Sequence, residues 1–355
     1  MRSTKTVVLA SASLAAAQFT PTLSNPELAN FSVIANDFSA IIGQTPSIEL
    51  IQNVTEPLFH EAGVFLNGTL YVSSNRIKVA SDPATADQTI LLHAVTNVMS
   101  GDLASIALNP ISTAQVVLPN GATQYGASGL IFTSQGSKTA SGGVFVIPDP
   151  VGNPNVSVPL VTDFHGKPFN SLNDVAVNAK DGNSVWFTDP DYGHAQGVRD
   201  APQLPNQVYR FDPATNATRA VADGFAKPNG LAFDAEFRTL YVTDTGATEA
   251  PDGAGPATIY AFDVVAEDGP FLANRRVFAY APKGVPDGIR VDNQGNVWSG
   301  IGSGLAVWNR AGTLLGQVMI EGGAANFGFA PNGTVFVLNE TKLWRVRLSG
   351  PAVLF

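Results

Sequence analysis

The chain has 355 residues, of which 45% are apolar and 14% charged, and it contains 34 Gly and 24 Pro, so it supplies a large core and many turns. This composition excludes a disordered protein, which needs low hydrophobicity and high charge. The net charge of −9 without a basic run argues against a nucleic-acid partner, and the absence of cysteine excludes disulfides and thiolate metal sites.

The first residues are typical of a secretory signal peptide. Arg2 and Lys5 form a positively charged start, residues 7–16 are apolar, and small residues end at Ala17. We therefore expect residues 1–17 to be removed and the protein to be secreted. A buried N-terminal helix is the simpler alternative. No later segment approaches the roughly 20 apolar residues of a membrane span, so we expect no membrane partner.

Residues 18–46 lie between this peptide and the first repeat. We expect them to form an extension that packs on the main domain, with a short helix near residues 35–42. Asn-x-Ser/Thr acceptor sites fit a glycoprotein of a eukaryotic secretory route. They begin at Asn30, Asn53, Asn67, Asn155, Asn216, Asn332 and Asn339.

A short strand-like pattern recurs along the rest of the chain. Its copies are LYVSS at 70–74, LIFTS at 130–134, VWFTD at 185–189, LYVTD at 240–244, VWSG at 297–300 and VFVLN at 335–339. Aligned copies follow one another after 60, 55, 55, 57 and 38 residues. A period near 55 holds four strands and their turns, which is one blade of a β-propeller. The sequence therefore predicts an all-β, six-bladed propeller.

The propeller domain should cover residues 47–355. Few residues follow the last copy, so we expect residues 47–52 to supply a strand that completes the final blade and closes the ring. An ordinary β-sandwich with coincidental spacing is the alternative, and six copies in register disfavour it. A parallel α/β fold is disfavoured because helices and strands do not alternate along the chain.

Polar residues precede several of the repeated strings at a matching place. Glu61, Asn173, Asn229 and Asp287 lie 10 to 13 residues before the aligned position, and Asn326 is a looser fifth. Here the chain enters the innermost strand of a blade, and all innermost strands surround the central channel. We therefore expect these side chains to meet at one mouth of that channel. Each has a simpler interpretation alone, since Asn-Gly and Asp-Gly are common turn pairs.

Two carboxylates and two amides present only oxygen to a cation. Hard oxygen ligands of this kind favour Ca²⁺ or Mg²⁺ over softer metals. We expect a central Ca²⁺ site, with Mg²⁺, Mn²⁺ or Zn²⁺ as alternative ions. Neutral amide ligands leave net charge on the ion and open positions for water or substrate, which is the arrangement of a catalytic metal.

The strings around these residues resemble the gluconolactonase/regucalcin (SMP-30/gluconolactonase/LRE-like) superfamily. They are FHEAGVF at Glu61, FNSLNDVAV at Asn173, KPNGLAF at Asn229 and VPDGIRVDNQGNVW at Asp287, together with VWFTDPDYG and LYVTDTG. The resemblance implies a six-bladed propeller with one divalent metal, usually calcium, held by Glu61, Asn173, Asn229 and Asp287. It also implies lactone hydrolysis, with Asn173 contacting metal or substrate. The long N-terminal segment resembles the fungal extracellular branch.

Asp287 is the candidate general base, because a carboxylate beside the ion can accept the proton of a water. Asn173 is the second catalytic candidate. Further substrate-binding candidates are His60, Asn170, Asp174 and Tyr192. Structural roles compete: Asp174 can start a strand, Asn170 can cap a loop, and strand alternation would point His60 away from its neighbour Glu61.

We expect a small-molecule lactone as substrate and a monomer or simple homo-oligomer. A phosphotriesterase-like enzyme and a biosynthetic cyclase or isomerase on the same propeller are alternatives that share these residues. A non-catalytic binding propeller is a third, and it would not require the axial carboxylates. A serine hydrolase is disfavoured, because the chain contains no G-x-S-x-G elbow.

Overall fold

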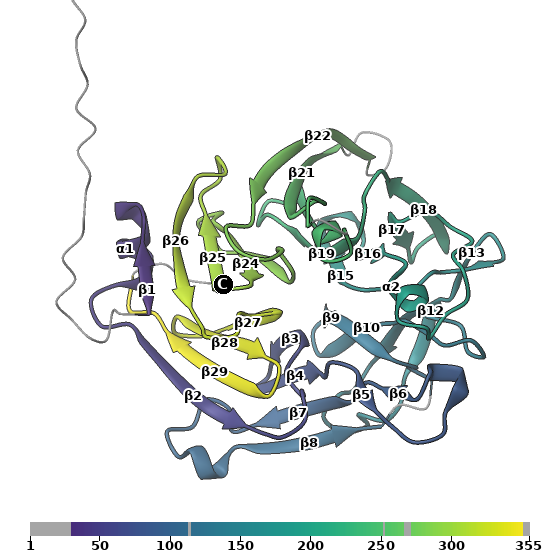
Figure 1. The fold of residues 1–355 in the computed structure, drawn as a ribbon, viewed down its shortest axis with the longest axis horizontal. Coiled ribbons are helices and arrows are strands. Elements are labelled where there is room, and N and C mark those ends of the chain that lie inside the picture. Colours follow the sequence, from purple (N-terminus) through teal and green to yellow (C-terminus); the bar gives the residue numbers. More distant parts are fainter. Residues whose placement is uncertain (1–29, 113–114, 251–252, 266–270, 351–355) are drawn as a thin grey trace, which may run out of the picture.

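The computed structural model describes residues 30–112, 115–250, 253–265 and 271–350. Six β-sheets surround one central axis (Figure 1), which confirms the predicted six-bladed propeller. The predicted signal peptide, residues 1–17, lies outside the described residues. In the part of the chain that the structure describes, no helix is long and apolar enough to cross a membrane.

Blades 1 to 4 each contain four antiparallel strands, which follow one another from the axis outward. Blade 1 is β3 (Glu61–Leu66), β4 (Thr69–Ser73), β7 (Leu92–Thr96) and β8 (Ala107–Ile111). Blade 2 is β9 (Pro119–Tyr125), β10 (Gly129–Ser134), β11 (Gly143–Ile147) and β12 (Val158–Val161). Blade 3 is β15 (Val175–Asn178), β16 (Ser184–Asp189), β17 (Gln207–Asp212) and β18 (Ala217–Ala222). Blade 4 is β19 (Pro228–Phe233), β20 (Thr239–Asp244), β21 (Thr258–Val265) and β22 (Phe271–Tyr280).

Strands from the N-terminal region complete blades 5 and 6. Blade 5 is β23 (Ile289–Val291), β24 (Val297–Ile301), β25 (Gly304–Trp308) and β26 (Leu314–Met319), with β1 (Phe31–Val33) outermost. Blade 6 is β27 (Asn326–Ala330), β28 (Thr334–Asn339), β29 (Lys342–Arg347) and the outermost β2 (Ser47–Asn53). Strand β2 is the predicted closing strand, and Figure 1 shows it beside β29. The two ends of the chain therefore close the ring in one sheet.

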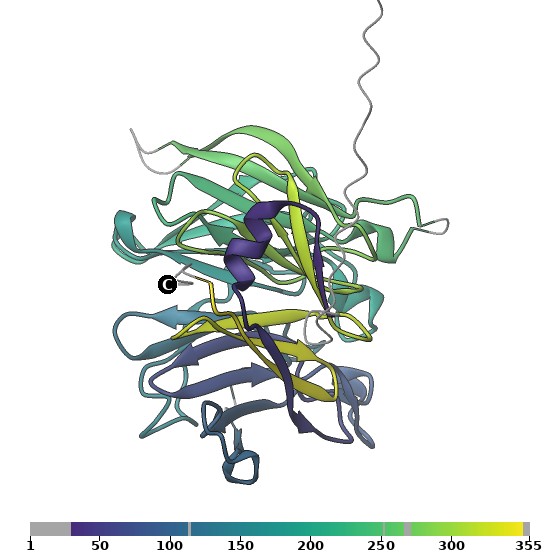
Figure 2. The same cartoon turned by 90° about the vertical axis from the view of Figure 1, so that its left-hand side faces the viewer.

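The segment before β2 lies against the outer edge of blade 5. Helix α1 (Asn36–Ile42) lies where the sequence predicts a helix, and Figure 2 shows it beside the propeller strands. Its Phe38, Ile41 and Ile42 are buried in the core between blades 5 and 6. Strand β1 was not predicted; it extends blade 5 by pairing Phe31 with Val318.

The six repeated strings form the second strands of the blades, β4, β10, β16, β20, β24 and β28. Each of these strands is buried on both faces, because a neighbouring blade packs on each side. The strings therefore read as continuous apolar runs rather than alternating ones. Among the described residues, six clusters of buried apolar side chains fill the six interfaces between blades.

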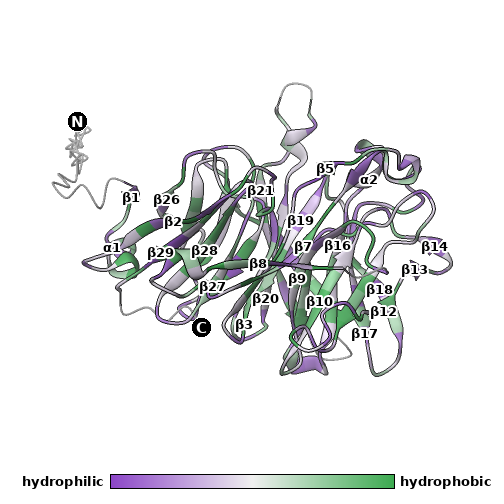
Figure 3. Cartoon of the chain, turned by 90° about the horizontal axis from the view of Figure 1, so that it is seen from below, coloured by the Kyte–Doolittle hydropathy of each residue, from purple (hydrophilic) through white to green (hydrophobic). Residues whose placement is uncertain are grey.

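Short elements connect the strands. They are the hairpins β5 (Ile77–Lys78)–β6 (Gln88–Thr89) and β13 (Asp163–Phe164)–β14 (Lys167–Pro168), helix α2 (Tyr192–Ala195), and the 3₁₀ turns Pro83–Thr85, Leu103–Ser105, Ala179–Asp181 and Gly246–Thr248. Figure 3 views the disc edge-on and shows β5 and α2 on the same face. That face contains the cavity at the axis.

Candidate metal centre and active site

The innermost strands bring the predicted polar residues together at the axis. Glu61 is the first residue of β3, Asn229 is the second of β19, and Asn173 and Asp287 stand two residues before β15 and β23. All four line one cavity of about 200 Å³. Residues from four blades thus meet at one mouth of the channel, as the repeat indicates.

Blade 2 contributes a fifth residue, Asn120, which the sequence pattern did not single out. It is the second residue of β9 and lines the same cavity. It stands 11 residues before Ile131, the same offset as the other four, and it is followed by Gly121 as Asn229 is followed by Gly230. The signal was therefore present. It is weak because polar residues follow it, where the other blades have an apolar run.

Several side-chain oxygens in this cavity have no hydrogen-bond partner. They are the Oδ1 atoms of Asn120, Asn173, Asn229 and Asp287, each removed from solvent. An unpartnered buried oxygen costs about 1–3 kcal/mol, so four of them at one place need an explanation. Oxygen atoms without donors suit a hard cation, which accepts several such ligands at once. The residues present therefore fit a calcium-type ion.

Glu61 is oriented by the sixth blade. It is 2% exposed, and its Oε2 accepts a 2.6 Å hydrogen bond from Asn326 Nδ2. Asn326 is the looser fifth residue of the sequence pattern, and its role is to hold a ligand candidate rather than to face the cavity. All six blades therefore place a polar residue at this level of the axis.

Hydroxyl groups of the second strands fix the backbone of these residues. Each donates to a main-chain carbonyl in the next blade: Ser73 to Asn120 at 2.7 Å, Thr133 to Asn173 at 2.6 Å, Thr188 to Asn229 at 2.7 Å and Thr243 to Asp287 at 3.0 Å. These hydroxyls are the small polar residues that end four of the repeated strings. The repeat thus contains both the strand and the contact that positions the next blade's candidate ligand.

The aspartates that follow two of these threonines act within their own blades. Asp189 accepts hydrogen bonds from the backbone N–H groups of Asn170 and Ser171, at 3.0 and 2.8 Å. Asp244 accepts from those of Ala226 and Lys227, at 2.9 and 2.8 Å. Each aspartate therefore holds the loop that leads into the inner strand.

Replacement of Thr188 by valine tests this contact. The hydroxyl accepts from Asp174 N at 3.0 Å and donates to Asn229 O, and valine keeps the shape without either bond. We expect Thr188→Val to lower the free energy of unfolding by about 1–3 kcal/mol. Thr313→Val, at an exposed turn, is the control and should change it by less than about 0.5 kcal/mol. Chemical denaturation measures both, and equal stability of the two variants would refute the positioning role.

The glycines of the Asn-Gly and Asp-Gly pairs allow neighbouring blades to approach closely. A Cβ atom on Gly230 would lie 2.5 Å from Asp287 O, and one on Gly288 would lie 2.3 Å from the Asn326 side chain. These pairs are therefore more than turn formers. They let the inner strands pack around a narrow axis.

The two carboxyl groups of the site are not ordinary acids. Burial, and then the charge of Asp287, raise the pKa of Glu61 to about 8. Burial, and then the charges of Glu340 and Asp174, raise the pKa of Asp287 to about 7. In both cases the protein disfavours the negative form, so a bound cation would offset a charge that the fold leaves uncompensated.

His60 lies in the same cavity as Glu61. The expectation that strand alternation would separate the two fails because β3 begins only at Glu61, so His60 precedes the strand. Its Nδ1 lies 2.8 Å from Glu340 Oε1. Burial lowers the pKa of His60, but the hydrogen bond and charge of Glu340 outweigh burial and raise it above the usual value.

Tyr192, at the start of α2, closes another side of the cavity. Its hydroxyl contacts Thr245 Oγ1 and accepts a 3.3 Å hydrogen bond from Asn229 Nδ2. Burial raises the pKa of Tyr192, so the phenol stays protonated. Next to it, Lys227 Nζ pairs with Asp191 at 2.5 Å and Glu249 at 2.7 Å. These ion pairs fix the wall of the mouth around Tyr192.

Two of the predicted substrate-binding residues lie outside the cavity. Asn170 is buried, and its Nδ2 donates to Leu204 O at 3.0 Å, so it acts on a loop. Asp174 is 1% exposed and its carboxylate accepts from the backbone N–H groups of Val175 and Leu231. Its side chain lies below the site rather than in it.

Charged ligands alone do not make this centre. In the described parts of the chain, no group of three or more His, Cys, Asp and Glu side chains is placed to hold a metal ion. The site combines two carboxylates with amides, so it depends on the Asn oxygens. Neutral ligands leave part of the ion's charge for a substrate.

The fold and the cavity define a six-bladed propeller with an oxygen-lined centre on its axis. Residues 105–328 match the family model described as the SMP-30/Gluconolactonase/LRE-like region, and the chain belongs to this family. The matched segment contains Asn120, Asn173, Asn229 and Asp287, and Glu61 precedes it.

Named relatives of the chain are lactone-hydrolysing enzymes. The lactonohydrolase oryL of Aspergillus oryzae is 28% identical over 363 residues, which cover 94% of this chain and 76% of that protein. A gluconolactonase of Zymomonas mobilis is 31% identical over 199 residues, which cover 53% of each protein. The structure of a Xanthomonas campestris gluconolactonase has a TM-score of 0.70 at 26% identity and covers 90% of this chain and 94% of that one.

Proposed function

We propose that this protein is a calcium-dependent hydrolase that opens a small, polar lactone with water as the nucleophile. The observation that carries the proposal is the convergence of four unpartnered Oδ1 atoms with Glu61 in one axial cavity. Membership of the family and the lactone-hydrolysing relatives support the reaction class. The ligand chemistry supports the cation.

Oxygen ligands of mixed charge favour calcium over other ions. Glu61 and Asp287 supply carboxylates, and Asn173, Asn229 and Asn120 supply amide oxygens. Ca²⁺ accepts six to eight such ligands in a flexible arrangement, whereas Mg²⁺ demands a near-ideal octahedron and retains its waters. A ring of three amides and two carboxylates therefore suits Ca²⁺, with room for water and substrate.

Asp287 is the residue that we expect to take the proton of the attacking water. Its Oδ1 faces the cavity without a partner, and its pKa of about 7 is close to neutral, where a general base is most effective. A bound calcium ion would polarise the lactone carbonyl and lower the pKa of a neighbouring water. Asn173 and Asn229 present amide oxygens at fixed positions, and Tyr192 offers a protonated hydroxyl to a substrate oxygen.

The walls of the cavity indicate a polar substrate. Apart from Val285, the lining side chains all carry polar groups, including those of Asn75, Arg76, Gln196 and Thr248. Such groups bind ring hydroxyls and the lactone oxygens, and they leave unpaired donors against an apolar ring. A volume of about 200 Å³ also selects small rings. We therefore propose a hydroxylated lactone of the aldonolactone type.

A panel assay tests this function. Hydroxylated five- and six-membered lactones, apolar lactones of equal ring size and an organophosphate ester are each assayed in chelator and in added Ca²⁺. We expect calcium-dependent opening of the hydroxylated lactones, with apolar lactones at least about tenfold slower. Faster turnover of the organophosphate than of every lactone, or undiminished lactone opening in chelator, would contradict the proposal.

Calcium binding should release protons. Because the raised pKa values leave Glu61 and Asp287 largely protonated below about pH 7, the cation must displace those protons before it binds. We expect calcium affinity to fall as pH falls below about 7, and proton release to vanish near pH 9. Calorimetric titration in two buffers of different ionisation enthalpy measures the protons. A heat of binding equal in both buffers at pH 6.5 would count against ligation by these carboxyl groups.

We also propose that the protein is secreted as a glycoprotein. Six acceptor residues are exposed: Asn30, Asn53, Asn67, Asn155, Asn216 and Asn332. Asn339 is 8% exposed and its Nδ2 donates to Gly323 O at 2.7 Å, so we expect it to remain unmodified. Expression in a secreting fungal host should yield protein in the medium that lacks residues 1–17. Peptide mapping that finds a glycan at Asn339 and none at the exposed sites would contradict this.

A further inference from the structure

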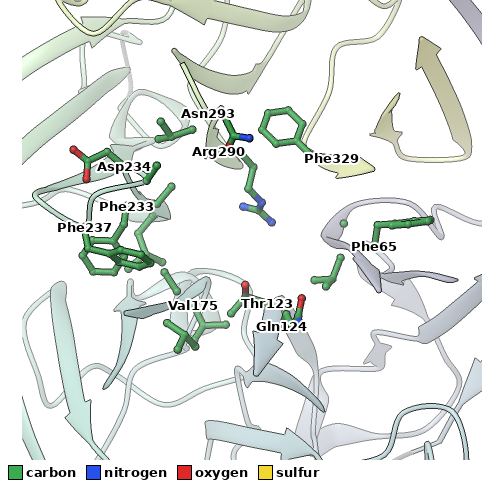
Figure 4. Close-up of a pocket in the computed structure, with 18 residues that line it drawn as sticks. Phe65, Thr123, Gln124, Val175, Phe233, Asp234, Phe237, Arg290, Asn293 and Phe329 are labelled. Carbon is green, nitrogen blue, oxygen red and sulfur yellow. The ribbon is translucent and has the colours of Figure 1, made fainter. Parts of the chain in front are cut away.

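The axial channel continues beyond the candidate ligands. A second cavity of about 460 Å³ is lined by residues that follow those ligands along the inner strands, such as Val64, Val175 and Leu231 (Figure 4). Its walls are mainly apolar. Figure 4 shows the Arg290 side chain extending into the middle of this cavity. A cation therefore lies on the channel axis, below the proposed calcium site.

Arg290 connects blade 5 to blade 1. Its Nη2 donates to Ala62 O at 2.9 Å, and its Nη1 donates to Ile289 O at 2.7 Å within its own strand. The side chain is 23% exposed, toward the cavity. These contacts hold the guanidinium across the channel rather than free in it.

Asp174 connects blade 3 to blade 4 and faces the same guanidinium. Its Oδ1 accepts from Val175 N at 2.8 Å, and its Oδ2 accepts from Leu231 N at 3.3 Å. The distance from Oδ2 to Arg290 Nη1 is 4.0 Å. Because Asp174 is 1% exposed, Arg290 offsets a charge that water does not reach.

Every contact of this pair lies next to a candidate calcium ligand. Ala62 follows Glu61, Asp174 follows Asn173, Leu231 stands two residues after Asn229, and Arg290 stands three residues after Asp287. The Arg290–Asp174 pair thus joins the four blades that carry the four predicted ligands. A shift of any one of these strands would change the spacing of the oxygens above it.

The backbone at Ala62 shows that this contact holds an unfavourable conformation. Ala62 has a φ of 71°, in the left-handed region that alanine rarely adopts, and the pairing of β3 with β4 has a bulge between Ala62 and Val64. Such a conformation costs about 1–3 kcal/mol and persists only where its surroundings enforce it. The Arg290 hydrogen bond to Ala62 O is one such restraint, directly after Glu61.

We propose that Arg290 is a positioning residue for the calcium site: an internal cation that, through Asp174 and Ala62 O, holds the ligand-bearing strands of blades 1, 3, 4 and 5 at the spacing that calcium requires. This inference rests on the proposed calcium site. It adds a residue that contacts neither ion nor substrate and acts from the opposite side of the ligand ring.

Calorimetric titration of the metal-free protein with CaCl₂ tests the proposal. The proteins compared are the wild type, Arg290→Met, Arg290→Lys and the control Arg210→Met. Arg210 is 6% exposed and pairs with Asp181 at 3.3 Å in the outer part of blade 3, so its loss also removes a buried cation from an Asp. Thermal melting of each metal-free variant measures stability separately from affinity.

We expect Arg290→Met to weaken calcium binding at least about tenfold, and Arg290→Lys to weaken it about threefold or more, because lysine retains the charge without the two-sided hydrogen bonding. Arg210→Met should lower the melting temperature and leave the calcium Kd within twofold. Methylguanidinium at millimolar concentration, entering through the 460 Å³ cavity, should restore part of the affinity of Arg290→Ala and leave the wild type unchanged.

The outcomes separate this inference from the proposed function. If the wild type itself does not bind calcium, the proposed function fails. If the wild type binds and the Arg290 variants bind equally well, the positioning role is overturned. If Arg290→Met does not fold, Arg290→Lys decides: an unchanged Kd overturns the role and a weaker one supports it. Equal weakening by Arg210→Met would reduce Arg290 to a general stabilising residue and also overturn the role.

Discussion

Replacing Asp287 with asparagine should lower kcat for lactone opening by about 10³-fold or more at saturating calcium. Asparagine keeps the shape and one oxygen of the side chain, but it cannot accept the proton of the attacking water. General base catalysis contributes typically about 10² to 10⁴-fold, and loss of a charged ligand adds to the effect. Steady-state kinetics on the preferred lactone, with circular dichroism to verify the fold, measures the change.

The control for this variant is Asp263→Asn. Asp263 lies on β21 in the outer part of blade 4, where its partly exposed carboxylate pairs with Arg276 at 2.8 Å. Its loss should leave kcat within twofold. If Asp287→Asn retained more than about a tenth of wild-type kcat, Asp287 would be a ligand or structural residue and the base would have to be sought elsewhere.

Replacing Glu61 with glutamine should have opposite effects on calcium binding and on the metal-free fold. Calcium affinity should fall by about 10²-fold, because the site loses one of its two negative ligands. The metal-free protein should become more stable at alkaline pH. Glutamine can still accept the hydrogen bond from Asn326 Nδ2, and it removes a buried charge.

The direction of the pH dependence follows from the pKa of Glu61, which burial and the nearby Asp287 raise from 4.5 to about 8. The unfolded chain then loses its proton at lower pH than the folded one, so the carboxyl destabilises the fold increasingly as pH rises through this window. We expect Glu61→Gln to raise the free energy of unfolding by about 3–5 kcal/mol at pH 9 and to leave it unchanged at pH 4.

Denaturant unfolding of the metal-free proteins at pH 4 and pH 9 measures this difference. Glu56→Gln removes an exposed carboxylate just upstream and should be neutral at both values. Lower stability of Glu61→Gln than of the wild type at pH 9 would mean that the carboxylate is compensated within the protein. The cation would then not be needed to offset its charge.

The sequence predicts the propeller because both its repeat and its central residues depend on local order. Each blade needs a second strand buried on both faces, which leaves a recognisable apolar string. The hydroxyl that ends four of these strings, as in Thr188, must reach the next blade's carbonyl. Glu61, Asn173, Asn229 and Asp287 were predictable because a polar residue enters each inner strand at a fixed distance from that string.

The remaining features depend on contacts between distant segments. Asn120 was missed because a polar stretch follows it, although its offset matches. Asn170 was placed with the substrate, yet it caps Leu204 O, a partner 34 residues away. Arg290 was not predicted at all, since a single arginine in a strand has no pattern. Its role follows from Ala62, a residue 228 positions away.

The most direct test is a crystal structure of the protein grown with calcium, with anomalous difference maps to locate the ion. We expect one peak on the propeller axis, within about 2.3–2.6 Å of oxygens from Glu61, Asn173, Asn229 and Asp287. Asn120 should contact the ion or a water bound to it. An empty cavity at millimolar calcium, or a peak away from these oxygens, would contradict the account.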